Sequence, residues 1–181
     1  ISGTDFGLKV YCDIGGDPST VGPTYYQVVW QRIYSASDSD IHGRLVSATG
    51  APLGAGVTYI ENSNSTVDQL PRISNSNGLP PDAEQDWNVV WTRVLPGGAT
   101  DIHGAQVHWD GLIRTPAFPI DVSFNSDATP AASSPLDRAS GPRPWMAVYH
   151  RSTTGDGDIA ARVFQGSTQL NAGFGRAVGD C

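Results

Sequence analysis

The sequence predicts an all-β protein made of three four-stranded repeats. A VVW segment followed by DIHG occurs twice at matching spacing and once more in altered form, and no window places apolar residues at the i, i+3, i+4, i+7 spacing of a helix. The composition agrees with this prediction, because 21 glycines and 13 prolines suit short strands joined by tight turns.

The first repeated element is an apolar run. Its copies are YYQVVWQR (25–32), DWNVVWTR (86–93) and PWMAVYHR (144–151). Consecutive apolar residues replace the alternation of a half-exposed strand, so both faces of this strand should be covered. We therefore expect the equivalent aromatic residues Trp30, Trp91 and Tyr149 to lie in the core.

The second repeated element follows each apolar run after a polar turn, as in an antiparallel hairpin. Its copies are DIHGRLV (40–46), DIHGAQV (101–107) and DIAARVF (158–164). A further apolar stretch follows each copy, at 57–60, 118–122 and 175–178. A short strand is expected before each apolar run, at 9–13, 69–74 and 129–133. Four short strands in a unit of about 60 residues is typical of a propeller blade.

The whole chain, 1–181, is predicted to be one domain, with repeats near 8–66, 67–127 and 128–181. Propellers use about four to eight blades, so three repeats are too few for an ordinary ring. The sequence leaves two arrangements open. The repeats could assemble into a larger ring with other chains, or close within one chain as a pseudo-threefold, β-trefoil-like barrel.

The runs YYQVVWQR…DIHGRLVSATGAPLG and DWNVVWTR…DIHGAQVHWDG resemble a tandem repeat of secreted bacterial surface proteins, whose usual form is YLVVW, a polar turn and DIYGARV. The resemblance covers most of the chain. The third copy departs from it, with AVY for VVW and DIAA for DIHG. The resemblance implies β-propeller-like blades and an extracellular or cell-surface location, and it implies no particular activity.

The two cysteines, Cys12 and Cys181, are predicted to form a disulfide. Buried free thiols would suit a cytosolic protein, but Cys181 stands at a chain end, where burial is unfavourable. In the repeat alignment Cys12 falls in the first strand of the first repeat, and Cys181 just after the last strand of the third. The bridge would thus join last to first repeat, within one chain or head to tail between chains, in an oxidising compartment.

Charge and hydropathy argue against two classes of partner. The net charge is −7 and no basic stripe is present, which argues against binding a nucleic-acid backbone. No apolar run approaches the roughly 18 residues of a membrane-spanning helix.

No cofactor is predicted, with calcium as the minor alternative. Asp38 and Asp40 in SDSD, and Asp156 and Asp158 in GDGD, resemble oxygen-rich calcium loops, but neither segment matches the EF-hand pattern. The aspartates that recur at one repeat position more simply accept backbone N–H groups in the hairpin.

No catalytic residues are predicted either. His42 and His103 hold equivalent places in two DIHG copies, and we expect them to pack on their strands rather than share a zinc ion. The sequence has no Gly-x-Ser-x-Gly, His-Glu-x-x-His or phosphate-binding loop.

The aromatic residues outside the repeat pattern are the candidates for ligand binding. Trp109 stands between His108 and Asp110 near a turn, where it could stack on a sugar ring or simply cover the core. Tyr34 is a second such aromatic. The sequence predicts a non-enzymatic extracellular structural or assembly subunit that associates with itself or with other surface proteins. The alternative is a lectin-like module that binds glycan.

Overall fold

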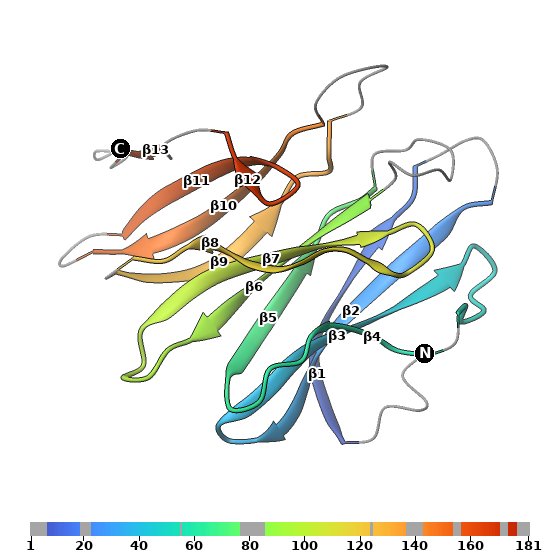
Figure 1. Cartoon of the computed structure of the whole chain (residues 1–181), viewed down its shortest axis with the longest axis horizontal. Helices are drawn as coiled ribbons and strands as arrows, with labels where there is room; N and C mark the ends of the chain where they lie inside the picture. Colours follow the sequence, from blue (N-terminus) through green and yellow to red (C-terminus); the bar gives the residue numbers. More distant parts are fainter. Residues whose placement is uncertain are drawn as a thin grey trace.

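The computed structural model describes residues 7–18, 23–54, 56–76, 86–123, 125–136, 143–153, 157–170 and 174–176. These residues form thirteen β-strands, with none of them in a helix (Figure 1). The predicted all-β class is confirmed. No described segment has the length and apolar character of a membrane-crossing helix.

The strands are β1 (Leu8–Gly16), β2 (Tyr25–Ser35), β3 (Asp38–Ser47), β4 (Thr58–Glu61), β5 (Val67–Ile73), β6 (Asp86–Val94), β7 (Thr100–His108), β8 (Ile113–Asp121), β9 (Ser126–Ala132), β10 (Trp145–Ser152), β11 (Gly157–Gln165), β12 (Thr168–Gln169) and β13 (Phe174–Arg176).

Within each of three groups the strands pair antiparallel, and together they form two open sheets. The larger runs β1-β2-β3-β5-β6-β7-β8, with β4 also on β3, and the smaller runs β12-β11-β10-β9, with β13 also on β11. The parallel bridge Ser39–Val67 joins β3 to β5. Figure 1 shows three successive groups, with β5–β8 between β1–β4 and β9–β13. The described strands therefore do not form the closed pseudo-threefold ring or trefoil-like barrel that the sequence had left open.

Both repeated elements take the same register in each group. The VVW and DIHG segments lie on β2 and β3 and again on β6 and β7, and each pair forms an antiparallel hairpin. The facing pairs are Trp30 with His42, Trp91 with His103 and, on β10 and β11, Tyr149 with Ala160.

Alternate residues of β6 serve two separate cores, because successive side chains point to opposite faces of a strand. Val89 and Trp91 pack with Val29 and Ile41 of the first group, and we call this contact the first boundary. Val90 instead packs with Trp145, Ala147, Tyr149, Ala160 and Phe164 of the third group, at the second boundary. Both faces of β6 are covered, as predicted, whereas Tyr26 of β2 and Met146 of β10 are exposed, so the first and third copies are fully covered on one face only. Trp30, Trp91 and Tyr149 are all buried, as expected.

The first strand of each group carries a bulge that the sequence did not reveal. The register of β1, β5 and β9 shifts at this point. One non-glycine residue in each bulge has a positive φ: Tyr11 (49°), Leu70 (56°) and Thr129 (48°). Such a conformation is unusual for any non-glycine residue and most so for β-branched Thr129. Because this conformation recurs at the same position of the first strand in all three groups, the bulge is a shared feature of their backbones.

The glycine of DIHG lies where a side chain has no room. A Cβ on Gly104 would lie 2.8 Å from Cδ1 of Ile120, and one on Gly43 would lie 2.9 Å from Cδ1 of Ile60. Each isoleucine comes from the fourth strand of its group. The glycine therefore allows the fourth strand to pack closely on the third.

We expect Gly104→Ala to lower the free energy of unfolding by about 1–3 kcal/mol, because Ile120 must shift within a packed core. Urea denaturation measures the loss, and adding Ile120→Val should recover part of it. Gly56→Ala is the control, since a Cβ there meets nothing within 4 Å. Equal losses in the two single variants would refute the packing argument.

Candidate functional site

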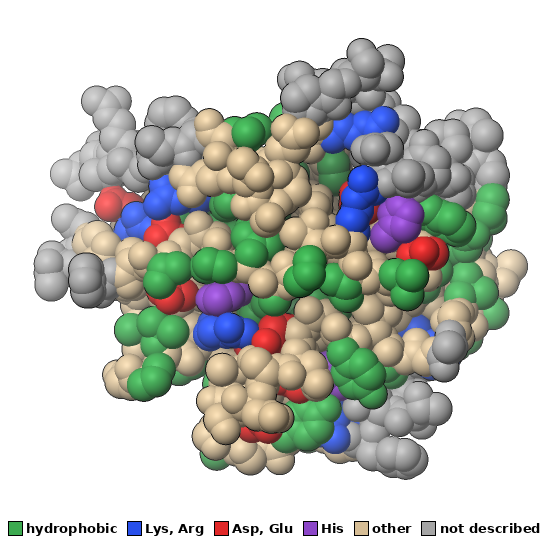
Figure 2. All heavy atoms as spheres, in the orientation of Figure 1, with side chains coloured by type: hydrophobic (Ala, Val, Ile, Leu, Met, Phe, Trp, Pro, Cys, Tyr) green, Lys and Arg blue, Asp and Glu red, His purple; other side chains and the backbone are tan. Residues whose placement is uncertain are grey.

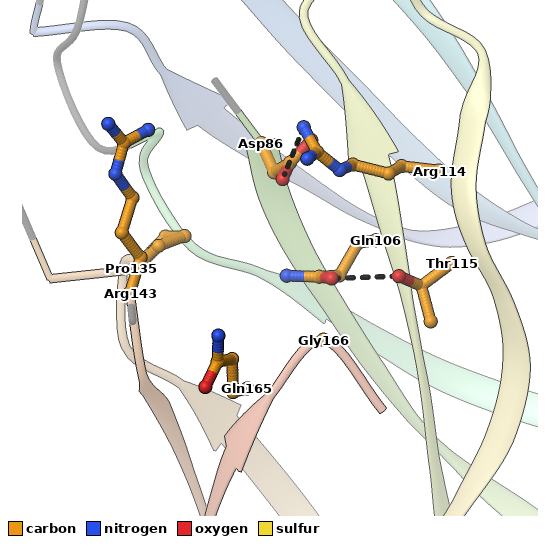
Figure 3. Close-up of a pocket in the computed structure, with 8 residues that line it drawn as sticks. All are labelled: Asp86, Gln106, Arg114, Thr115, Pro135, Arg143, Gln165 and Gly166. Carbon is orange, nitrogen blue, oxygen red and sulfur yellow. Dashed lines mark hydrogen bonds and ion pairs between the residues drawn. The ribbon is translucent and has the colours of Figure 1, made fainter. Parts of the chain in front are cut away.

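A polar pocket of about 310 Å³ lies where the second group of strands meets the third (Figure 3). Asp86 comes from the start of β6, Gln106 from β7 and two side chains from β8, while the opposite wall comes from the β11–β12 turn. The lining residues are Asp86, Gln106, Arg114, Thr115, Pro135, Arg143, Gln165 and Gly166. The pocket is thus assembled from segments that are far apart in the sequence.

A chain of hydrogen bonds fixes one wall of the pocket. Thr115 Oγ1 donates to Gln106 Oε1 at 2.8 Å, and Gln106 Nε2 donates to Asn88 Oδ1 at 2.9 Å. Asn88 Nδ2 then donates to the carbonyl of Ser133 at 2.9 Å, in the third group. Because both amides are buried, this chain holds their donors and acceptors in one orientation.

A charged cluster stands at the edge of the same pocket. Asp86 Oδ1 lies 3.1 Å from His108 Nδ1, and Asp86 Oδ2 lies 3.4 Å from Arg114 Nη1. Burial raises the pKa of Asp86, although both neighbours act to lower it. Figure 2 likewise shows acidic and basic side chains interspersed on the face it draws. The pocket offers hydrogen-bond donors and acceptors for a small polar ligand.

The structure brings two of the four predicted ligand residues, His108 and Asp110, to this region. His108 contacts Asp86, and His108 and Asp110 line a shallow neighbouring pocket with Arg114. Trp109 is half-buried and stacks on Tyr25, with ring centroids 6.3 Å apart and planes 27° apart. One face of the indole therefore packs between strand groups rather than standing open.

Tyr34 does not join them, because it lies at the other end of β2 from Tyr25. The guanidinium of Arg32 lies 3.9 Å above its ring, and the ring also contacts His42 edge-on.

Among the described residues, no group of three His, Cys, Asp or Glu side chains is arranged to hold a metal. Asp38 and Asp40 lie on β3 and Asp158 on β11, whereas Asp156 falls outside the described residues. His42 is fully buried against Tyr59, and His103 lies against Trp91. Both histidines pack on their strands.

Cys12 is exposed in the bulge of β1 and has no disulfide partner among the described residues. Cys181 lies outside those residues, so the bridge stays a prediction.

Two buried charge clusters, one at each boundary, were not foreseen. At the first boundary Arg93 donates to both carboxylate oxygens of Asp68, at 2.8 and 2.9 Å, and its Nη2 lies 3.0 Å from Glu61. Trp91 Nε1 also donates to Asp68, at 2.7 Å. Asp68 belongs to the same strand group as Arg93, whereas Glu61 ends β4 of the preceding group.

The second boundary repeats this arrangement. Arg151 donates to Asp127 of its own group at 3.0 Å and to Asp121, which ends β8 of the preceding group. Tyr149 also donates to Asp121, as does Arg162 at 2.6 Å. The signal in the sequence is an acidic residue directly after Ile60 and Ile120, with a second aspartate shortly afterwards.

The first cluster has more buried acid than base. Asp40 is 3% exposed, and its Oδ1 has no hydrogen-bond partner among the described residues. Burial, and then the charges of Glu61, Asp38 and Asp68, raise the pKa of Asp40 to about 7 from 3.8. The folded state therefore binds this proton more tightly than the unfolded chain. Its contribution to stability is present at low pH and is lost as pH rises towards 7.

We expect Asp40→Asn to raise the free energy of unfolding by about 1–4 kcal/mol at about pH 8, with no gain at about pH 4. Urea denaturation at both pH values measures this difference. Asp110→Asn is the control, because Asp110 is exposed. An effect of Asp40→Asn that is the same at both pH values would contradict the assignment.

Comparison with protein-family models, curated proteins and solved structures found no match for this chain.

Proposed function

We propose that the protein is a non-enzymatic structural or assembly module of a cell surface or extracellular filament, made of three four-stranded β-repeats. The repeats are β1–β4, β5–β8 and, in the third, β9, β10, β11 and β13 as the fourth strand, with the two-residue β12 as an additional strand, and they are arranged like blades of a propeller. The observation that carries the proposal is that two boundaries use the same parts, an apolar core and an arginine held by two carboxylates. The first and third repeats of such an array each have one side that no neighbouring repeat of this chain covers, and these sides are available for assembly.

The end of the array formed by the first repeat supports this function. We call it the outer face, and define it as the side of β1–β4 turned away from the first boundary. Ile14, Tyr26, Tyr34 and Tyr59 are 41–59% exposed there. At the other end, Met146 and Ile159 are exposed on β10 and β11. Exposed apolar side chains gathered at one end of a molecule mark interaction surfaces, so these ends are suited to bind other surface proteins.

Fractionation of the producing cells tests the proposal. We expect the wild-type chain in a high-mass extracellular or surface-bound fraction, and we expect Tyr26→Ser/Tyr59→Ser to shift it towards free monomer. Both tyrosines are exposed, so their replacement should leave the fold intact. A wild-type chain found only as free monomer, or only inside the cell, would refute the proposal.

Binding of a glycan is the second candidate, and the polar pocket of Figure 3 favours it. Amides, a carboxylate and guanidinium groups can match the hydroxyl groups of a sugar. A glycan array separates the sources of any binding. Loss in Gln165→Ala but not in Trp109→Ala would place the sugar in this pocket, and the reverse would place it on the indole. Absence of binding would remove this candidate.

A further inference from the structure

We call the first and second boundaries the inner boundaries, and each contains one arginine held by two carboxylates. Strand register identifies the equivalent arginine of the first repeat. In each repeat an arginine of the second strand faces one residue of the first strand. The facing pairs are Arg93 with Asp68, Arg151 with Asp127 and Arg32 with Lys9. The carboxylate that each inner boundary takes from its own first strand is therefore replaced by a lysine in the first repeat.

The second carboxylate of each inner boundary ends the fourth strand of the preceding repeat. Strand register identifies the equivalent position in the third repeat as well. In each repeat this position faces the isoleucine that follows the repeated aspartate of the third strand. The facing pairs are Glu61 with Ile41, Asp121 with Ile102 and Arg176 with Ile159. The third repeat thus carries arginine where the first and second carry an acid.

At a junction between a third repeat and a first repeat, basic residues would therefore stand at both positions that hold an acid at the inner boundaries. Docking of a second copy in the manner of the inner boundaries would set the register position of Arg176 against those of Lys9 and Arg32, and neither position that holds an acid at those boundaries would hold one here. Like charges at a desolvated contact oppose association, and they select against the wrong partner. The outer face is complementary to a repeat whose fourth strand ends in an acid.

We propose that the outer face of the first repeat docks a separate four-stranded β-repeat that brings Asp or Glu to Lys9 and Arg32, and that it rejects a second copy of this chain. This inference rests on the proposed function and names its partner. The contact continues the joint already seen twice, because Trp30 holds the register position of Trp91 and Tyr149.

The bulge in the first strand of each repeat also indicates that the first repeat docks a partner on its outer face. The residue after the positive-φ position is Pro71 in β5 and Pro130 in β9, and both are buried. Its equivalent in β1 is Cys12, which is exposed. The first repeat therefore shows an uncovered version of a surface that its two counterparts bury.

We call the proposed rejection of a second copy by basic residues at these two positions the charge rule. Placing acids at both positions in the full chain tests it. Lys9→Asp/Arg176→Glu rebuilds both carboxylate positions, and sedimentation equilibrium in reducing buffer compares its self-association with that of wild type. We expect a monomeric wild type and at least about tenfold tighter association of the double variant, weakened by salt. Adding Tyr59→Lys should abolish this gain. Arg72→Glu/Arg114→Glu, which makes a similar charge change at two exposed positions elsewhere, should stay monomeric.

Two results would overturn the inference. One is a wild type that already associates and loses that association on Tyr59→Lys. The other is a double variant that keeps its circular dichroism spectrum and associates no more tightly than wild type. The fractionation of producing cells tests whether assembly is the function at all, whereas this measurement on purified chain tests only the charge rule. The two can therefore fail separately.

Discussion

Replacing Trp91 with alanine is expected to lower the free energy of unfolding by about 3–5 kcal/mol, the usual loss for a buried tryptophan. Trp91 is fully buried at the first boundary, so its removal leaves a cavity between two strand groups. It also removes the hydrogen bond from the indole to Asp68. Chemical denaturation followed by circular dichroism measures the loss.

Trp109→Ala is the matched control for this experiment. Trp109 is half-buried and stacks on Tyr25 at the end of β7, so its removal should cost less than half as much. Equal, small shifts of the denaturation midpoint in the two variants would contradict the assignment of Trp91 to the core.

Arg93→Met is expected to cost about 3–5 kcal/mol, because it leaves two buried carboxylates without their cation. Asp68 is fully buried and Glu61 is 7% exposed, so neither can be solvated in place of the lost ion pair. Part of the loss should be recovered at low pH, where the carboxylates take up protons and no longer need a cation. Urea denaturation of wild type and variant at about pH 4 and about pH 7 measures both effects.

Arg114→Met is the control, since Arg114 is exposed and its ion pair with Asp86 is longer, at 3.4 Å. We expect a cost within about 1 kcal/mol for this exposed pair. If Arg93→Met cost no more than Arg114→Met, the cluster would be a surface ion pair and not a structural centre.

The sequence predicted best those features that depend on short segments. The run Val89-Val90-Trp91 indicated a strand covered on both faces, and the structure places these residues in two cores. Consecutive apolar residues are sufficient for this inference, since alternate side chains point to opposite faces of a strand.

Features made by contacts between distant segments were beyond the sequence. Arg93 was visible within its repeated segment, but its partner Glu61 comes from another strand group, and only packing brings the two together. The pocket beside Gln106 and Gln165 is likewise formed by two groups. The stacking of Trp109 on Tyr25 could not be predicted for the same reason.

The first and second boundaries are copies of one joint, and paired double-mutant cycles test this equivalence most directly. One cycle combines Arg93→Met with Glu61→Gln, and the other combines Arg151→Met with Asp121→Asn. We expect a favourable coupling energy of at least about 1 kcal/mol in both cycles, because each arginine lies against a buried carboxylate of the preceding group. A coupling near zero in either cycle would contradict it.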